Sequence, residues 1–133
     1  MTDATQLTAA ILLITVPTIA LGGNFMLRVL SGGVPTTAQQ RSFFRAGHAH
    51  AGVLVTLSLV ALLYIDGAGI TGIPAGVATT AIVVSPILIP AGFFLSMIGS
   101  GRTEPNGLKV LIHLGAISLG AGTLTQGGAL LGA

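Results

Sequence analysis

The sequence predicts an all-α integral membrane protein, a four-helix bundle whose antiparallel helices cross the bilayer up-down-up-down as one domain over residues 1–133. Two observations predict this. First, 52% of the 133 residues are hydrophobic and only 6% are charged, whereas about a quarter of the residues of a soluble domain are charged. Second, four stretches stay apolar over about 20 residues, the length that a helix needs to cross the hydrocarbon core.

The four predicted spans cover about residues 8–30, 43–65, 74–98 and 108–131. Turn-forming residues separate them, in Ser31–Pro35, Asp66–Gly69 and Gly99–Gly107. Connections this short make successive helices antiparallel neighbours. The first stretch has Asp3 and no basic segment before it, so we expect a mature span rather than a signal peptide.

The cations predict an orientation. All five lie at or in the first and third connections: Arg28, Arg41, Arg45, Arg102 and Lys109. The positive-inside rule therefore places both termini on the non-cytoplasmic side, in a bacterial-type cytoplasmic membrane. These cations either anchor the helices at the lipid headgroups or contribute to a site. They are too few for a nucleic-acid-binding face, so no nucleic acid is expected as a partner.

The three histidines lie at one predicted depth. His48 and His50 follow the start of the second span, and His113 follows the start of the fourth. At 1.5 Å per residue, all three lie roughly 8–10 Å inside the cytoplasmic boundary. Asn24 and Arg28 of the first span share this layer. Polar residues inside a membrane are candidates for function by default, and the alternative is a hydrogen bond between helices.

Helical spacing separates the two neighbouring histidines. A polar stripe on the second span contains Arg45, His48, Gly52 and Thr56, at steps of three and four residues. His50 points roughly 160° away from His48, because successive residues of a helix turn by about 100°. The two therefore cannot bind one metal ion from a regular helix. The adjacent glycines would allow a planar ligand to approach closely.

A b-type haem between two histidines of facing helices is the leading cofactor candidate. His48 and His113 meet the depth condition and are the predicted metal pair. Copper or zinc would require both His48 and His50 to project inward. The cofactor's identity stays open at this point. The candidate binding residues are His48, His50, His113, Arg45, Asn24, Arg28, Gly52 and Thr56.

The fourth span carries a seam of small residues at alternating steps of three and four, which suits close helix packing in lipid. The seam consists of Gly115, Ser118, Gly122, Thr125, Ala129 and Gly132. His113 lies on nearly the opposite face. If both faces contact protein, a homo-oligomer or a larger membrane complex is expected. The alternative is that the seam packs within the chain and His113 reaches the headgroups.

Prolines interrupt two spans, at Pro17, Pro86 and Pro90. Each removes a backbone donor, and such helices either line solute pathways or simply shape the packing. No carboxylate lies inside a predicted span, which disfavours proton antiport or hydrolysis by a buried acid. The absence of cysteine excludes disulfides and thiolate sites.

Three functions fit these observations. The first is a ligand-binding or redox module of the haem or quinone type near the histidines. The second is an oligomeric channel or carrier for a neutral or anionic small solute, with Arg45 and His48 at its mouth. The third is a non-catalytic accessory subunit of a larger complex. None of them requires an enzyme activity, and we assign no catalytic residue.

Overall fold

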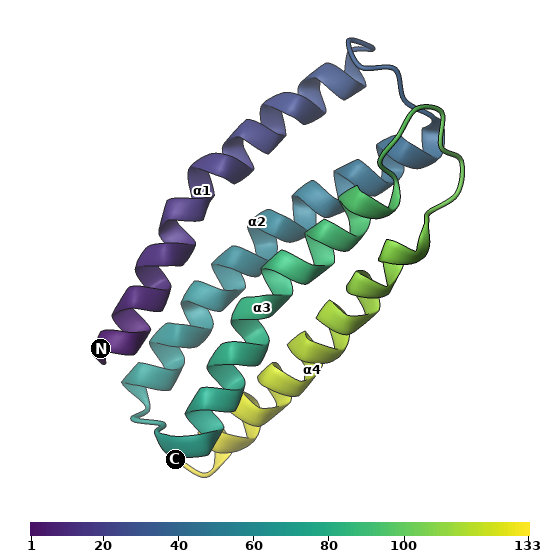
Figure 1. Ribbon diagram of the computed structural model, residues 1–133. Coiled ribbons are helices and arrows are strands. Elements are labelled where there is room, and N and C mark those ends of the chain that lie inside the picture. The colour runs from purple at the N-terminus through teal and green to yellow at the C-terminus, as the bar shows by residue number, and fades with distance from the viewer.

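The computed structural model describes residues 1–133 as four long helices and one short 3₁₀ helix, without strands (Figure 1). The helices are α1 (Asp3–Leu30), α2 (Ala38–Gly67), α3 (Gly72–Ser96), η1 (Gly107–Lys109) and α4 (Val110–Leu131). Each of the four long segments is long and apolar enough to cross a membrane. The predicted all-α bundle of four packed helices, each able to span a membrane, is thereby confirmed.

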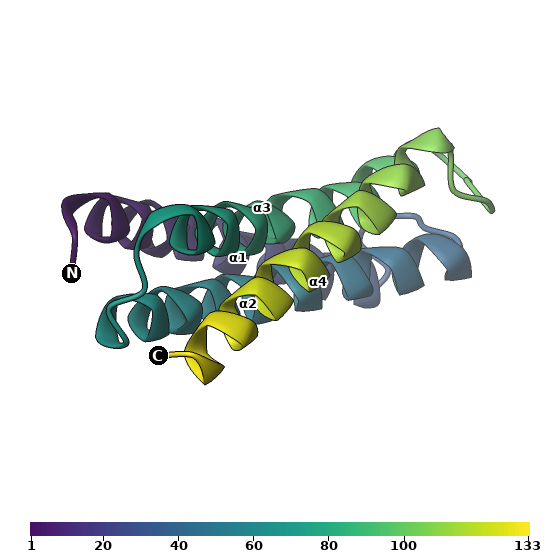
Figure 2. The ribbon, with the colours of Figure 1, turned by 90° about the horizontal axis from the view of Figure 1, so that it is seen from below.

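Successive helices run antiparallel, and both termini lie at the same end as the α2–α3 connection (Figure 1). The opposite end carries the connections 31–37 and 97–106, together with all five cations, and we refer to it as the basic end. The helices pack in chain order: α1 against α2, α2 against α3, and α3 most extensively against α4. Figure 2 shows α4 lying obliquely to the other helices.

The α1 and α2 helices each begin five residues before the apolar stretch that predicted them, because polar caps satisfy their first turns. The hydroxyl of Thr2 accepts a hydrogen bond from the Thr5 amide at the start of α1. At the start of α2, Thr37 and Gln40 form a reciprocal capping box. The α2 helix therefore starts five residues before the predicted span, which began at Phe43.

Gln40 also ties the two connections of the basic end together. Its side chain is almost fully buried, and its Nε2 donates hydrogen bonds to the carbonyl oxygens of Met97 (3.0 Å) and Gly99 (2.6 Å). The hydroxyl of Thr37 donates to the carbonyl of Arg102 at 2.6 Å. The start of α2 thus fixes the path of connection 97–106.

The small-residue seam of α4 packs against α3. A Cβ added to Gly115 would lie 2.5 Å from Ile89 Cγ1, and one on Gly122 would lie 2.7 Å from Ile82 Cγ1. Ser118 donates a hydrogen bond to the carbonyl of Ala81 at 2.8 Å. The seam therefore packs within the chain, which is one of the two alternatives that the sequence left open. By itself it requires no partner chain. Thr125 and Ala129 are half-buried and Gly132 is exposed beyond the helix end.

Pro86 and Pro90 lie inside α3, and Pro17 lies inside α1. Pro86 has no amide to pair with the carbonyl of Ile82, four residues earlier. The buried hydroxyl of Ser85 donates to that carbonyl instead, at 2.7 Å. The proline therefore leaves no unpaired backbone oxygen at this point of the core.

Candidate functional site

A cavity of about 320 Å³ lies between α1, α2 and α3 in the middle of the bundle. Its lining comes from residues 11–22 of α1, 48–55 of α2 and 83–94 of α3. We call this cavity the His48 groove, because His48 is its only titratable side chain. Most of the lining is apolar, which is typical of small-molecule sites that also contain a few polar groups.

Packing of α2 against its two neighbours positions His48. The preceding residue, Gly47, faces α3, where an added Cβ would lie only 2.9 Å from Phe94 Cε2. Turned by about 100° from Gly47, His48 faces α1. There, Cβ atoms added to Gly22 and Gly23 would lie 3.4 Å from its Nδ1 and Nε2 respectively. Glycines on α1 and α2 therefore make room for the imidazole and hold it between the helices.

His48 is half-buried and makes no hydrogen bond within the chain, unlike the other two histidines. Its ring nitrogens are not fully covered by neighbouring atoms. The only side-chain polar atom of the chain that is both fully covered and without a hydrogen-bond partner is Thr36 Oγ1. A neutral imidazole offers one donor and one acceptor. Both are therefore free for a molecule in the groove.

The other polar groups of the groove are already paired. The hydroxyl of Thr15 donates to the carbonyl of Leu12 at 2.6 Å, and that of Thr18 donates to the carbonyl of Thr15 at 2.6 Å. Each hydroxyl can still accept a hydrogen bond. His48 is thus the one side chain that can donate to a bound molecule.

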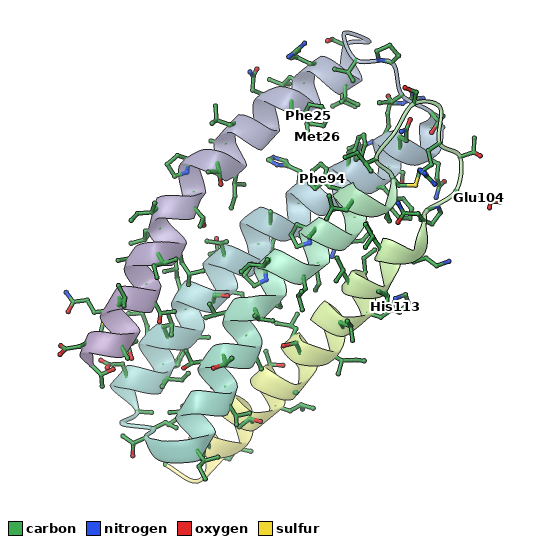
Figure 3. All side chains as sticks on the ribbon, viewed as in Figure 1. Phe25, Met26, Phe94, Glu104 and His113 are labelled. Carbon is green, nitrogen blue, oxygen red and sulfur yellow. The ribbon has the colours of Figure 1, made fainter.

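The groove opens sideways rather than toward either end. The α1 helix packs mainly on α2 and has little contact with α3, so the α1–α3 side is open. At its rim lie Ile11, which is 55% exposed, and Ile87, which is 65% exposed. In a bilayer this opening would face acyl chains. Figure 3 shows Phe25 and Met26 on the side of α1 that faces α2, where they close the groove toward the basic end.

The structure does not bring the other two histidines to this groove. His50 is exposed; its Nδ1 lies 2.7 Å from the carbonyl of Ala46, and its ring lies 5.2 Å from the ring of Phe93. His113 is exposed on α4, where its Nδ1 lies 3.3 Å from the carbonyl of Lys109. Figure 3 shows His113 pointing away from the other helices.

The predicted metal pair of His48 and His113 is therefore separated, because the seam turns the opposite face of α4 toward α3. No group of three or more histidine and acidic side chains is arranged to hold a metal ion. The remaining members of the predicted binding set lie outside the groove. Asn24, Arg28, Arg45 and Thr56 are exposed, and Gly52 borders open space.

The sequence interpretation missed most of the groove lining. On α1, the lining residues Leu12, Thr15, Ile19 and Gly22 follow one another at steps of three and four, and all are at least half-buried. This spacing marks the face of α1 that packs on the bundle. This spacing is the signal in the sequence that identifies the α1 side of the groove.

Comparison of the chain with protein family models, with curated proteins and with solved structures finds no match.

Proposed function

We propose that this protein binds a membrane-soluble, quinone-type molecule in the His48 groove. The observation that carries the proposal is a half-buried imidazole without an intramolecular partner, in an apolar cavity that opens toward the bilayer. A quinone ring is apolar on its faces and carries carbonyl oxygens, one of which would accept a hydrogen bond from His48. Its isoprenoid tail would leave through the α1–α3 opening.

A haem with two axial histidines from one chain fits the geometry less well. Only one histidine lines the groove, and His50 and His113 are exposed on other faces. The cavity of about 320 Å³ is at the lower end of the usual range for small-molecule sites, roughly 300–1,000 Å³. A single flat ring suits this volume better than a porphyrin.

Equilibrium binding of decylubiquinone and menadione to the protein in lipid nanodiscs tests the proposal. Replacing His48 by Phe keeps a ring of similar shape but removes the hydrogen bond, and we expect the Kd to rise about tenfold, or 1.4 kcal/mol. His48→Gln retains a donor and should retain part of the affinity. His113→Phe is the matched control and should bind like the wild type.

Two results would overturn the proposal. One is that neither quinone binds the wild-type protein above the level of empty nanodiscs. The other is that His48→Phe and His113→Phe change the Kd equally, since partition into the lipid alone would then explain the signal.

One observation favours a carrier as a second candidate function. A further cavity of about 310 Å³ lies between the same three helices at the end that carries the termini, and it is lined by several threonines and by Asp66. Leu12, which is buried against Val55 and Leu62, separates it from the His48 groove. A small uncharged solute could cross if this contact and the closure by Phe25 and Met26 toward the basic end both opened. Glycerol uptake into proteoliposomes should then increase in the double variant Leu12→Ala, Met26→Ala and not in Val16→Ala, whose side chain is exposed.

We also propose that the basic end faces the cytoplasm of a bacterial-type cell. The distribution of the five cations supports this orientation.

In either orientation, the quinone-type ligand would exchange within the membrane, through the sideways opening of the groove, and would require no aqueous entrance.

A further inference from the structure

The polar side chains of the His48 groove differ in what they offer a ligand. Three of the lining residues carry one, namely His48, Thr15 and Thr18. A neutral imidazole offers one hydrogen-bond donor and one acceptor, whereas a hydroxyl offers one donor and two acceptor lone pairs. Which of these groups are free within the chain decides which ligand the groove prefers.

The protons of both threonine hydroxyls are already used. The hydroxyl of Thr15 donates to the carbonyl oxygen of Leu12, and that of Thr18 donates to the carbonyl oxygen of Thr15, each at 2.6 Å. This distance is at the short end of the range for O–H···O hydrogen bonds. What the two hydroxyls have left for a ligand is therefore their acceptor lone pairs.

Both threonines lie near the glycine of α1 that contacts His48. Thr18 precedes Gly22 by four residues and Thr15 precedes it by seven, so both share its side of the helix. At 1.5 Å per residue, they lie about 6 Å and about 10 Å from Gly22 along the helix axis. The imidazole of His48 lies against Gly22. A ring that contacts His48 and extends along α1 therefore meets the threonines next.

The two redox forms of a quinone-type ligand pair differently with this lining. An oxidised quinone carries two carbonyl oxygens, which only accept. One of them can pair with the N–H of His48, but the other meets the acceptor lone pairs of the threonines. A threonine hydroxyl could donate to it only by leaving its own backbone carbonyl, so that one hydrogen bond is lost for the one gained.

A reduced quinol avoids this conflict. It carries two hydroxyls, each of which both donates and accepts. One hydroxyl pairs with His48, and the other donates to a threonine oxygen while the threonine keeps its bond to the backbone. The quinol therefore gains a hydrogen bond that the quinone lacks.

We propose that the His48 groove binds the quinol form of its ligand more tightly than the quinone form, and that Thr15 and Thr18 determine this preference. This inference rests on the proposed function and adds the redox state of the ligand to it. One hydrogen bond of ordinary net strength corresponds to a preference of about fivefold. A protein with this preference retains the reduced ligand and releases it more readily once it is oxidised.

Equilibrium binding of decylubiquinone and decylubiquinol to the protein in lipid nanodiscs tests this preference, with the quinol kept reduced under anaerobic conditions. The measured quantity is the ratio of the quinone Kd to the quinol Kd, and we expect about 5 for the wild type. The double variant Thr15→Val, Thr18→Val keeps the shape of both side chains without their hydroxyls. Its quinol Kd should rise and its quinone Kd should stay in place, so that the ratio falls about fivefold.

Two further variants control for other effects. Thr15→Ser, Thr18→Ser keeps both hydroxyls and should keep the ratio of the wild type. Thr8→Val removes a hydroxyl that also donates to a backbone carbonyl of α1, that of Ala4 at 2.8 Å. Thr8 lines the cavity at the end that carries the termini and not the His48 groove, so this variant should also keep the ratio.

The possible failures are distinguishable. If both ligands bind and the double valine variant keeps the ratio of the wild type, or if Thr8→Val lowers the ratio equally, the threonines do not select the redox form. That result overturns this inference and leaves the quinone-type site standing on the His48→Phe comparison. If neither form binds the wild type above the level of empty nanodiscs, the proposed function and this inference are both wrong.

Discussion

The imidazole of His48 lies directly against Gly22, at such a distance that a Cβ on the glycine would be 3.4 Å from Nδ1. This contact joins α1 to α2 and forms one wall of the His48 groove. Its closeness depends on the missing side chain, because any larger residue at position 22 would compete for the space beside the ring.

Enlarging Gly22 should therefore reduce ligand binding with little effect on folding. A methyl group at position 22 just meets the imidazole, so we expect Gly22→Ala to raise the quinone Kd severalfold and Gly22→Val to raise it by about tenfold. Gly52→Ala is the control, because a Cβ there meets nothing within 4 Å. Unchanged binding in Gly22→Val would show that the ligand does not occupy the groove beside His48.

Enlarging a glycine in the seam between α3 and α4 should instead lower the stability of the protein. In Gly122→Ala, the new methyl would lie 2.7 Å from Ile82 Cγ1 and 2.9 Å from the Ile82 backbone nitrogen, so one helix must shift. We expect the free energy of unfolding to fall by about 1–3 kcal/mol, measured by thermal or SDS denaturation in detergent. Gly128→Ala, where no atom lies within 4 Å, should be neutral or slightly stabilising.

Gln40 should be essential to the basic end. In Gln40→Leu, the carbonyls of Met97 and Gly99 lose their side-chain donor, and a buried group without a partner costs about 1–3 kcal/mol. The same denaturation assay checks this expectation. Gln39→Leu alters an exposed neighbour and should have little effect; equal loss in both variants would show that the hydrogen bonds of Gln40 are not what stabilises this end.

The orientation can be measured because the chain has no cysteine. A single cysteine at Ser100, in the α3–α4 connection, should react with a membrane-impermeant maleimide only after inverted vesicles or permeabilised cells expose the cytoplasmic side. A cysteine at Ala68, between α2 and α3, should react in intact cells. The opposite pattern would reverse the orientation that the cations predict.

The four spans were predictable because lipid imposes a simple requirement: each crossing must be a long apolar helix with its backbone paired internally. Hydropathy and turn residues carry that information. The exact ends of the helices were less predictable, because the cap formed by Thr37 and Gln40 extends α2 beyond its apolar part. The seam of Gly115 and Gly122 was also visible in the sequence, but whether α3 or another chain covers it was not.

The candidate site was predictable only in part. Helical spacing separated His48 from His50, and that separation matches their different surroundings. Spacing cannot say which neighbour each face meets, since that depends on how Gly47 and Phe94 set α2 against α3. For the same reason, equal depth grouped His113 with His48, although the two lie on helices that turn these faces to different sides.

The most direct test of the account is the imidazole ¹⁵N spectrum of the protein in nanodiscs. The chain has only three histidines, so each signal can be assigned with one variant per residue. On titration with decylubiquinone, the account predicts that the His48 signals shift saturably while those of His50 and His113 stay in place. A spectrum in which all three histidines remain unchanged, or in which His50 and His113 shift as much as His48, would contradict it.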